Sequence, residues 1–262
     1  MWDHGGARRD LSASEEDDEI AIGRANFPAM IREGGGLHPD PRLQKALQRF
    51  MAPLVAASDR AHLPWTMALT TSMDPNARAS FGGTVVVFAG IISMCETPGE
   101  LASVLAHEIG HVDLLHMISD NDLGLLKRQA GIGSGALTGA TQAMAPEARA
   151  AMERSMEKLL NISFTRMEEE EADKHISRIF DRVGLDLRWA ESMFRKLALV
   201  SDDFSFETGL TQDHPAPLTR AQLIRDQMAF YTPPSQERQL PGWAELKAPF
   251  PTPPKFRFLK ES

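Results

Sequence analysis

The chain has 262 residues, of which 42% are hydrophobic and 24% charged, a composition typical of a globular protein whose core fits within one domain. Its formal net charge of −8 argues against nucleic acid and anionic lipid as main partners, because both attract basic proteins. No stretch approaches the roughly 18 consecutive apolar residues of a membrane-spanning helix. Peripheral contact with a membrane and the oligomeric state stay open.

The N-terminal segment is charged and lacks the apolar stretch of a signal peptide. Residues 1–18 are expected to be a disordered, solvated tail that contains most of the acidic run Glu15-Glu16-Asp17-Asp18-Glu19. The protein is therefore expected in the periplasm if an export signal was removed upstream, and in the cytoplasm otherwise.

Two helices are expected next in the chain. Residues 19–31 carry apolar side chains at helical spacing and are followed by three glycines at 34–36, which break a helix. Residues 41–57 predict a second, amphipathic helix. Its apolar face consists of Leu43, Ala46, Leu47 and Phe50.

Two strands follow. The first is expected over residues 65–70, and a turn follows at Asp74-Pro75-Asn76. The second is expected over residues 82–90, which are rich in β-branched side chains. The second strand has two interpretations of equal weight: a free edge that pairs with an extended peptide, or a core strand. Cys95, the single cysteine, follows in an apolar segment and is expected to be a small buried hydrophobic residue.

The most informative segment is His107-Glu108-Ile109-Gly110-His111. Two histidines four residues apart on a helix lie one above the other, about 6 Å along the axis, so both imidazoles can reach one metal ion. Glu108 is rotated by about 100° from His107, so its carboxylate can reach a water on that metal without being a ligand. Two nitrogen ligands, an open metal position and a nearby base are the requirements of zinc-assisted hydrolysis.

The surrounding sequence predicts a helix with one buried side. Thr97 can cap this helix, Pro98 suits its first position, and Glu100 completes a capping box. Apolar residues then recur at helical spacing, at Leu101, Val104, Leu105, Ile109, Val112 and Leu115. This context favours a metal site over the alternative of two surface histidines on an ordinary helix.

A catalytic zinc ion needs a third protein ligand, and the acidic run 168–171 offers four candidates within an expected long helix over 147–183. Their positions around the helix distinguish these candidates. Glu169 lies on the apolar face of the helix, as does Asp173 one turn later, whereas Glu170 lies on the solvent-exposed face. Burying an ionised carboxylate costs free energy, and a bound metal cation compensates this cost. Glu169 is therefore the expected third ligand, and Asp173 is close enough to orient a ligand or a metal-bound species.

The remaining segments are less informative. Residues 119–146 contain several glycines and are interpreted as a loosely packed helical insert, with a flexible lid and a surface-seeking amphipathic piece as alternatives. Helices are expected over 185–199 and in the later part of 213–230. Residues 232–262 are rich in proline and are expected to form an extended tail that either lies on the surface or is disordered.

The expected fold is α+β and mostly helical, with a small β-sheet that precedes the His-Glu-x-x-His helix. One domain is expected over residues 19–231, between the acidic tail of 1–18 and the proline-rich tail of 232–262.

Three motifs resemble those of zinc metallopeptidases of the HtpX, BepA and Oma type, which are related to the CAAX prenyl endopeptidases. The first runs from Gly82-Gly83 and its strand to residues 99–111, and the second is Arg166-x-x-Glu169-x-Glu171-Ala172-Asp173. The third is His214-Pro215-x-x-x-x-Arg220. The motifs occur in family order, and the likeness covers roughly residues 15–230. The membrane-spanning segments of some relatives have no counterpart in this chain.

The resemblance implies a gluzincin-type metallopeptidase domain with one zinc ion per chain. It places this ion on His107, His111 and Glu169, and it makes Glu108 the general base. Both assignments agree with the spacing and phase arguments, which were made from the residues alone.

The resemblance also implies catalytic roles near the metal for Asp173 and His214. In some relatives the equivalent histidine approaches the zinc, and whether His214 ligates it in a latent state stays open. Arg220 is expected to fix that loop or to contact the substrate, including its oxyanion. Taken alone, His214 and Arg220 would be unremarkable loop and helix-start residues.

The expected function is a zinc-dependent endopeptidase that hydrolyses peptide bonds of protein substrates with a metal-activated water. Misfolded or envelope proteins are the expected substrates, which would give the protein a part in protein quality control. Two alternatives stay open: a zinc-stabilised chaperone or scaffold without turnover, and a zinc hydrolase that acts on a non-peptide bond.

Overall fold

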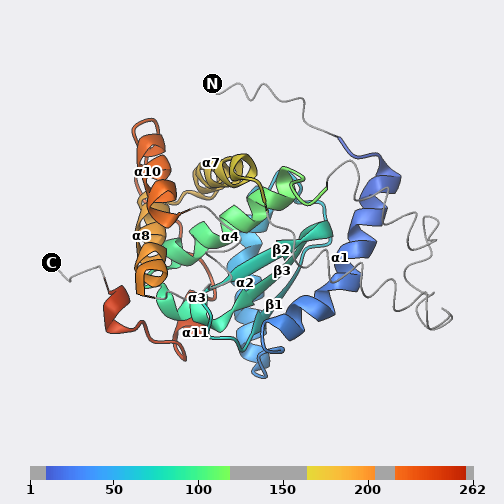
Figure 1. Ribbon diagram of the computed structural model, residues 1–262, viewed down its shortest axis with the longest axis horizontal. Helices are drawn as coiled ribbons and strands as arrows, with labels where there is room; N and C mark the ends of the chain where they lie inside the picture. Colours follow the sequence, from blue (N-terminus) through green and yellow to red (C-terminus); the bar gives the residue numbers. More distant parts are fainter. Residues whose placement is uncertain (1–9, 119–163, 204–215, 258–262) are drawn as a thin grey trace.

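The computed structural model describes residues 10–118, 164–203 and 216–257 (Figure 1). Within these residues, three strands form one sheet: β1 (Thr66–Thr70), β2 (Ala77–Ser80) and β3 (Thr84–Phe88). β3 is the central strand, parallel to β1 and antiparallel to β2. The expected α+β fold, mostly helical with a small sheet before the His-Glu-x-x-His helix, is confirmed.

Helices cover both faces of β3, which explains its uninterrupted apolar sequence. Val85 and Val87 belong to the main core cluster, which they share with residues of helices α2 (Pro41–Ala57) and α4 (Pro98–Asp113). Val86 and Phe88 point the other way, because side chains alternate along a strand, and they pack with Met30 of helix α1 (Ala13–Glu33). β3 is therefore a core strand with both edges paired, and the alternative of a free edge on this strand is wrong.

The edge strands of the described sheet are β1, which the sequence predicts, and β2, which it does not. The residues of β2 are Ala-Arg-Ala-Ser, none of them β-branched or aromatic, so its β propensity is low. It follows the expected turn at residues 74–76, and a short 3-10 helix (Phe81–Gly83) joins it to β3. β2 lies next to α4, as Figure 1 shows.

The helix that carries the His-Glu-x-x-His segment is α4, and its start is as expected. Thr97 accepts a hydrogen bond from the Glu100 backbone, and the Glu100 side chain accepts one from the Thr97 backbone. Pro98 occupies the first turn. The short helix α3 (Ala89–Met94) precedes α4, and Cys95 between them is fully buried, as expected of a small hydrophobic residue.

Helix α7 (Arg166–Val183) follows the part of the chain that is not described. The expected continuous helix over 147–183 is wrong at residues 164–165, which are not helical, and α7 begins at Arg166; residues 147–163 lie outside the described residues. Thr165 and Glu168 form a capping box that stops the helix there, a signal contained in the sequence. Its C-terminal end agrees with expectation, since Gly184 adopts the left-handed conformation with φ 82°. The glycine-rich insert of 119–146 lies outside the described residues.

Helix α1 includes the acidic run that was expected in a disordered tail. It begins at Ala13, where Ser12 and Glu15 form a capping box. Glu19 is buried and accepts hydrogen bonds from the Arg60 guanidinium and the Gly82 backbone. The expected tail of residues 1–18 is therefore wrong from residue 13 onward, because capping and a buried ion pair stabilise the helix.

The described part of the C-terminal segment is packed rather than loose. It contains helix α11 (Trp243–Lys247) and a 3-10 helix (Pro254–Phe256). Four of its apolar side chains belong to the main core cluster, namely Leu240, Leu246, Phe250 and Phe256. The expectation of an extended surface tail or a disordered one is therefore wrong for residues 232–257, because apolar residues between the prolines are buried.

Two further helices complete the described fold. α8 (Arg188–Asp203) and α10 (Pro217–Met228) pack against each other, α8 packs on α4, and α10 packs on α7 (Figure 1). Among the residues that the structure describes, no helix combines the length and apolar character needed to cross a bilayer.

Candidate active site

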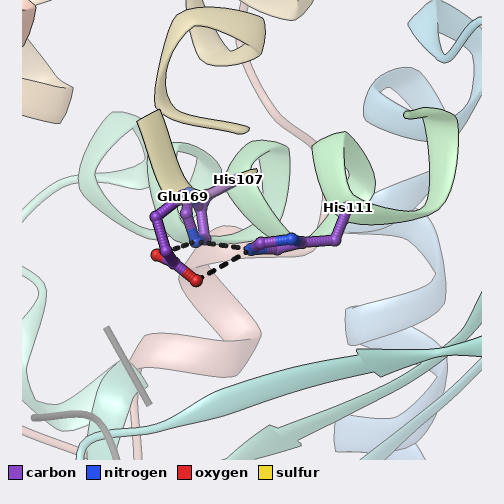
Figure 2. A group of neighbouring side chains, drawn as sticks. All are labelled: His107, His111 and Glu169. Carbon is purple, nitrogen blue, oxygen red and sulfur yellow. Dashed lines mark hydrogen bonds and ion pairs between the residues drawn. The ribbon is translucent and has the colours of Figure 1, made fainter. Parts of the chain in front are cut away.

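His107 and His111 of α4 meet Glu169 of α7 in the interior of the protein, and Figure 2 shows the three side chains converging. His107 Nε2 lies 3.1 Å from His111 Nε2. The Glu169 carboxylate lies 3.5 Å from His107 Nε2 through Oε2 and 3.4 Å from His111 Nε2 through Oε1. All three residues are buried, and we call them the ligand cluster.

A glycine allows α7 to come this close to α4. A Cβ atom on Gly110 would lie 3.2 Å from the Ala172 backbone and 3.2 Å from His175 Cβ, tighter than ordinary contact. Gly110 therefore lets the two helices approach between His107 and His111. This approach brings the side chain of Glu169 to both imidazoles.

The ligand cluster fits a zinc ion in both spacing and chemistry. Ligand atoms about 2.0–2.1 Å from a tetrahedral zinc ion lie about 3.3 Å from one another. The separation of 3.1 Å between the two Nε2 atoms is close to this value, and each Nε2 lies 3.4–3.5 Å from one of the two Glu169 oxygens. Two imidazoles and one carboxylate also form a ligand set of catalytic zinc sites.

Asp173 of α7 and Arg220 of α10 both contact His107. Asp173 Oδ1 is 2.9 Å from His107 Nδ1. Arg220 donates two hydrogen bonds to this carboxylate, from Nη2 to Oδ1 at 2.7 Å and from Nε to Oδ2 at 3.0 Å. The guanidinium carbon of Arg220 lies 4.2 Å from the centre of the Phe194 ring. Asp173 holds the Nδ1–H of His107, and His107 Nε2 lies 3.5 Å from Glu169 and 3.2 Å from Arg220 Nη2.

The charge state of this network follows from its contacts. Burial raises the pKa of Asp173, but Arg220 and His107 outweigh burial and lower this pKa to about 2. Asp173 is therefore ionised at neutral pH. Burial and Arg220 lower the pKa of His107, yet the bonds to Asp173 and Glu169 raise it to about 9. Burial lowers the pKa of His111 well below its ordinary value.

Glu108 is buried on α4 beside the ligand cluster without being part of it. Its Oε2 accepts a hydrogen bond of 2.7 Å from the backbone N–H of Ala79 in β2. This bond fixes the carboxylate between α4 and the edge strand. The position agrees with a base that lies near the metal but does not bind it.

The structure describes Glu169 and Arg220 of the expected site but not His214. Glu169 is the one fully buried member of the acidic run 168–171, as helical phase predicts. Arg220 is buried with its guanidinium on Asp173, so its contacts favour a positioning role over contact with the substrate. His214 lies outside the described residues.

Sequence reasoning missed His116, whose Nδ1 lies 3.0 Å from His111 Nδ1. In a continuous helix a residue five positions after His111 would lie about 140° around the axis and face away. α4 ends at Asp113, however, and the following turn brings His116 back. The ring of Phe164 also stacks on His111, with ring centres 3.8 Å apart.

A second cluster of similar residue types also lies between α4 and α7. Asp59, Asp113 and His175 place possible ligand atoms within 4.8 Å of one another, and we call them the clasp cluster. Asp113 accepts hydrogen bonds from His175 Nε2 at 2.8 Å, from the Ser58 hydroxyl, and from the backbone N–H groups of Asp59 and Arg60. Protein donors thus satisfy the Asp113 carboxylate.

Asp59 is compensated in the same way. It forms ion pairs with Arg178 at 2.9 Å and with Arg182 at 2.7 Å, both on α7. These two cations neutralise the charge that a metal would otherwise have to balance. The clasp cluster therefore ties the end of α2 to α4 and α7 without a metal ion.

Comparison with known proteins identifies the family. The model of peptidase family M48 matches residues 41–228. The chain belongs to this family. The resemblance inferred from the three motifs is thereby confirmed, since the chain is a member of the M48 peptidase family, whose members depend on a metal.

Several relatives share this M48 domain. A putative beta-barrel assembly-enhancing protease of Vibrio cholerae serotype O1 is 29% identical over 83% of this chain and 45% of its own length. The beta-barrel assembly-enhancing protease of Escherichia coli K12 is 30% identical over 74% of this chain and 40% of its own. The metalloprotease LoiP of the same organism is 30% identical over 60% of each chain. The part of each assembly-enhancing protease that this chain matches is less than half of that protease's length.

Proposed function

We propose that this M48 peptidase is a zinc-dependent endopeptidase that hydrolyses internal peptide bonds of protein substrates. The observation that carries the proposal is the convergence of His107, His111 and Glu169 at the spacing of a tetrahedral zinc site, with Glu108 beside them. When bound, zinc supplies the Lewis acidity that activates water and polarises a carbonyl group.

The chain's own residues divide the remaining work. Glu108 accepts a proton from the attacking water and passes it to the leaving nitrogen. Asp173 holds the Nδ1–H of His107 so that the other ring nitrogen faces the metal, and Arg220 holds Asp173. Asp173 and Arg220 therefore position the ligand cluster. His214 remains a proposed catalytic residue.

The edge strand β2 is the proposed place for the substrate backbone. The N–H of Ala79 points away from β3 toward Glu108, and N–H groups on one side of a strand recur at every second residue. An extended peptide that pairs with this edge would pass beside the proposed base. Such backbone pairing suits a protein substrate of varied sequence better than a small amide or ester.

The substrate class proposed here is unfolded protein of the cell envelope, with the periplasm as the compartment. This substrate class is supported by the name of the relatives, beta-barrel assembly-enhancing protease. The test is digestion of an outer-membrane β-barrel protein in its unfolded and folded forms. Cleavage of the unfolded form is expected, and cleavage of casein without cleavage of either form would contradict the substrate class alone.

The proposal predicts that Glu108→Gln keeps the metal and loses proteolysis, because the amide cannot accept the water proton. Metal content by mass spectrometry and casein cleavage would be measured on the same preparations. Turnover that persists in the variant at full zinc occupancy would contradict the role of Glu108. Removal of zinc with a chelator should stop the wild-type reaction and added zinc should restore it, whereas a scaffold or chaperone would show no metal-dependent cleavage.

A further inference from the structure

We propose that His116 is a positioning residue for the metal site, where it fixes the orientation and tautomer of His111 and is itself held by Glu171. The inference rests on the proposed zinc site. It gives the ligand cluster a second supporting network, on the opposite side from Asp173.

The backbone after α4 is shaped to bring His116 to this place. Leu115 has φ 61°, in the left-handed region that a residue with a Cβ atom adopts only at a cost in free energy. The turn is closed by a hydrogen bond of 3.0 Å from the His116 backbone N–H to the His111 carbonyl. The left-handed residue therefore returns the chain over the last turn of the helix, with the side chain of His116 beside the ring of His111.

The hydrogen bonds form a chain with one consistent proton arrangement. If His111 presents the lone pair of Nε2 to the metal, its Nδ1 carries the proton and donates to His116 Nδ1, 3.0 Å away. His116 then carries its own proton on Nε2, which lies 3.3 Å from Glu171 Oε2. Each group in the chain has the donor or acceptor that its neighbour requires.

The His116 side chain is buried, so water does not compete for its hydrogen bond with His111. The His116 side chain is only 5% exposed, and its ring centre lies 5.1 Å from that of His111. Phe164 stacks on the His111 ring with an interplanar angle of 16°, which restricts rotation of that ring. His111 is thus held by an aromatic face and by an acceptor at Nδ1, whereas His107 is held by the carboxylate of Asp173.

The test is zinc affinity, measured by competition with a chromogenic chelator on the full chain. We expect His116→Ala to weaken zinc binding by about 10–100-fold, the usual effect of losing a partner of a metal-bound histidine. His116→Asn should restore affinity to within about 3-fold of wild type, because the amide oxygen takes the place of Nδ1 as acceptor. His62→Ala, which breaks a histidine–glutamate pair at the surface, is the matched control and should leave affinity unchanged.

Three outcomes would overturn the proposal: wild-type affinity in His116→Ala, an equal loss in His116→Asn, or an equal loss in the His62 control. The zinc-loaded wild type gives a test that needs no variant, since long-range nitrogen–proton NMR spectra report histidine tautomers. A proton on His116 Nε2 supports the proposal, and a proton on Nδ1 overturns it. Failure of the proposed zinc site itself would be distinct, because the wild type would then bind no zinc and Glu169→Ala would change nothing.

Discussion

The ligand cluster and the clasp cluster use the same kinds of residue and lie between the same two helices, but their atoms are arranged for different purposes. In the ligand cluster, His107 Nε2, His111 Nε2 and the Glu169 carboxylate face one another at 3.1–3.5 Å. In the clasp cluster, hydrogen-bond donors surround Asp113 and two arginines neutralise Asp59.

The difference indicates how a metal site can be told from a group of similar residues. In a metal site the ligand atoms face one another, and the hydrogen-bond donors of the protein do not occupy them. In the ligand cluster, Asp173 contacts Nδ1 of His107 and His116 contacts Nδ1 of His111, and the Nε2 atoms of the two rings face each other. In the clasp cluster the bonds occupy the carboxylate oxygens themselves. We therefore expect substitutions in the first cluster to change zinc affinity and those in the second to change stability.

The largest effect is expected for Glu169→Gln. Loss of the anionic ligand should weaken zinc binding by more than about 100-fold and abolish proteolysis, because even residues behind the ligands cost about 10–100-fold. Chelator competition and casein cleavage would measure both. Glu170→Gln, at a neighbouring glutamate paired with Arg166, is the control. Equal zinc affinity in Glu169→Gln and Glu170→Gln would mean that the ligand cluster does not bind the zinc.

A smaller effect is expected for Asp173→Asn, which keeps an acceptor for His107 but removes its charge. Zinc affinity should fall by about 10–100-fold, because the partner of a metal-bound imidazole raises its basicity. The measurement is again chelator competition, with urea unfolding of the metal-free protein to separate stability from affinity. Asp181→Asn, on the exposed side of α7, serves as control. An unchanged affinity would contradict the positioning role of Asp173.

In the clasp cluster, Asp113→Asn should lower the free energy of unfolding by about 1–3 kcal/mol, because the amide leaves buried donors such as His175 and Ser58 poorly paired. Zinc affinity should stay within about 3-fold of wild type. Urea unfolding of the metal-free protein measures the first quantity. A large loss of zinc affinity without loss of stability would indicate that this cluster, too, serves the metal.

The smallest effect is expected for Arg182→Ala, which removes a half-exposed partner of Asp59. Exposed ion pairs contribute about 0.2–1 kcal/mol, and Arg178 still compensates the carboxylate. The loss should shrink at high salt, which urea unfolding at two salt concentrations would show. A loss well above this range would mean that the pair is coupled to the buried bonds of Asp113.

Local signals in the sequence predicted much of this arrangement. Thr97 and Glu100 gave the start of α4 because a capping box needs only residues three apart. Glu169 was chosen from its run by helical phase, which depends on the helix alone. Thr165 and Glu168 form a capping box of the same kind, which explains why α7 begins at Arg166 within the expected helix over 147–183.

Features that depend on the path of the chain in space were not predictable in this way. The strand β2 has low β propensity and forms because β3 supplies an edge beside α4. His116 faces His111 only because Leu115 takes a left-handed conformation that no residue type at that position suggests. Arg220 reaches Asp173 across 47 positions of sequence, a contact that α7 and α10 create by packing together.

The most direct test of the central claim is a crystal structure of the zinc-loaded protein with anomalous difference density recorded on both sides of the zinc absorption edge. The account predicts one zinc peak within about 2.0–2.2 Å of His107 Nε2, His111 Nε2 and a Glu169 oxygen. It predicts no zinc peak at Asp59, Asp113 and His175. A zinc peak at the clasp cluster, or none at the ligand cluster, would contradict it.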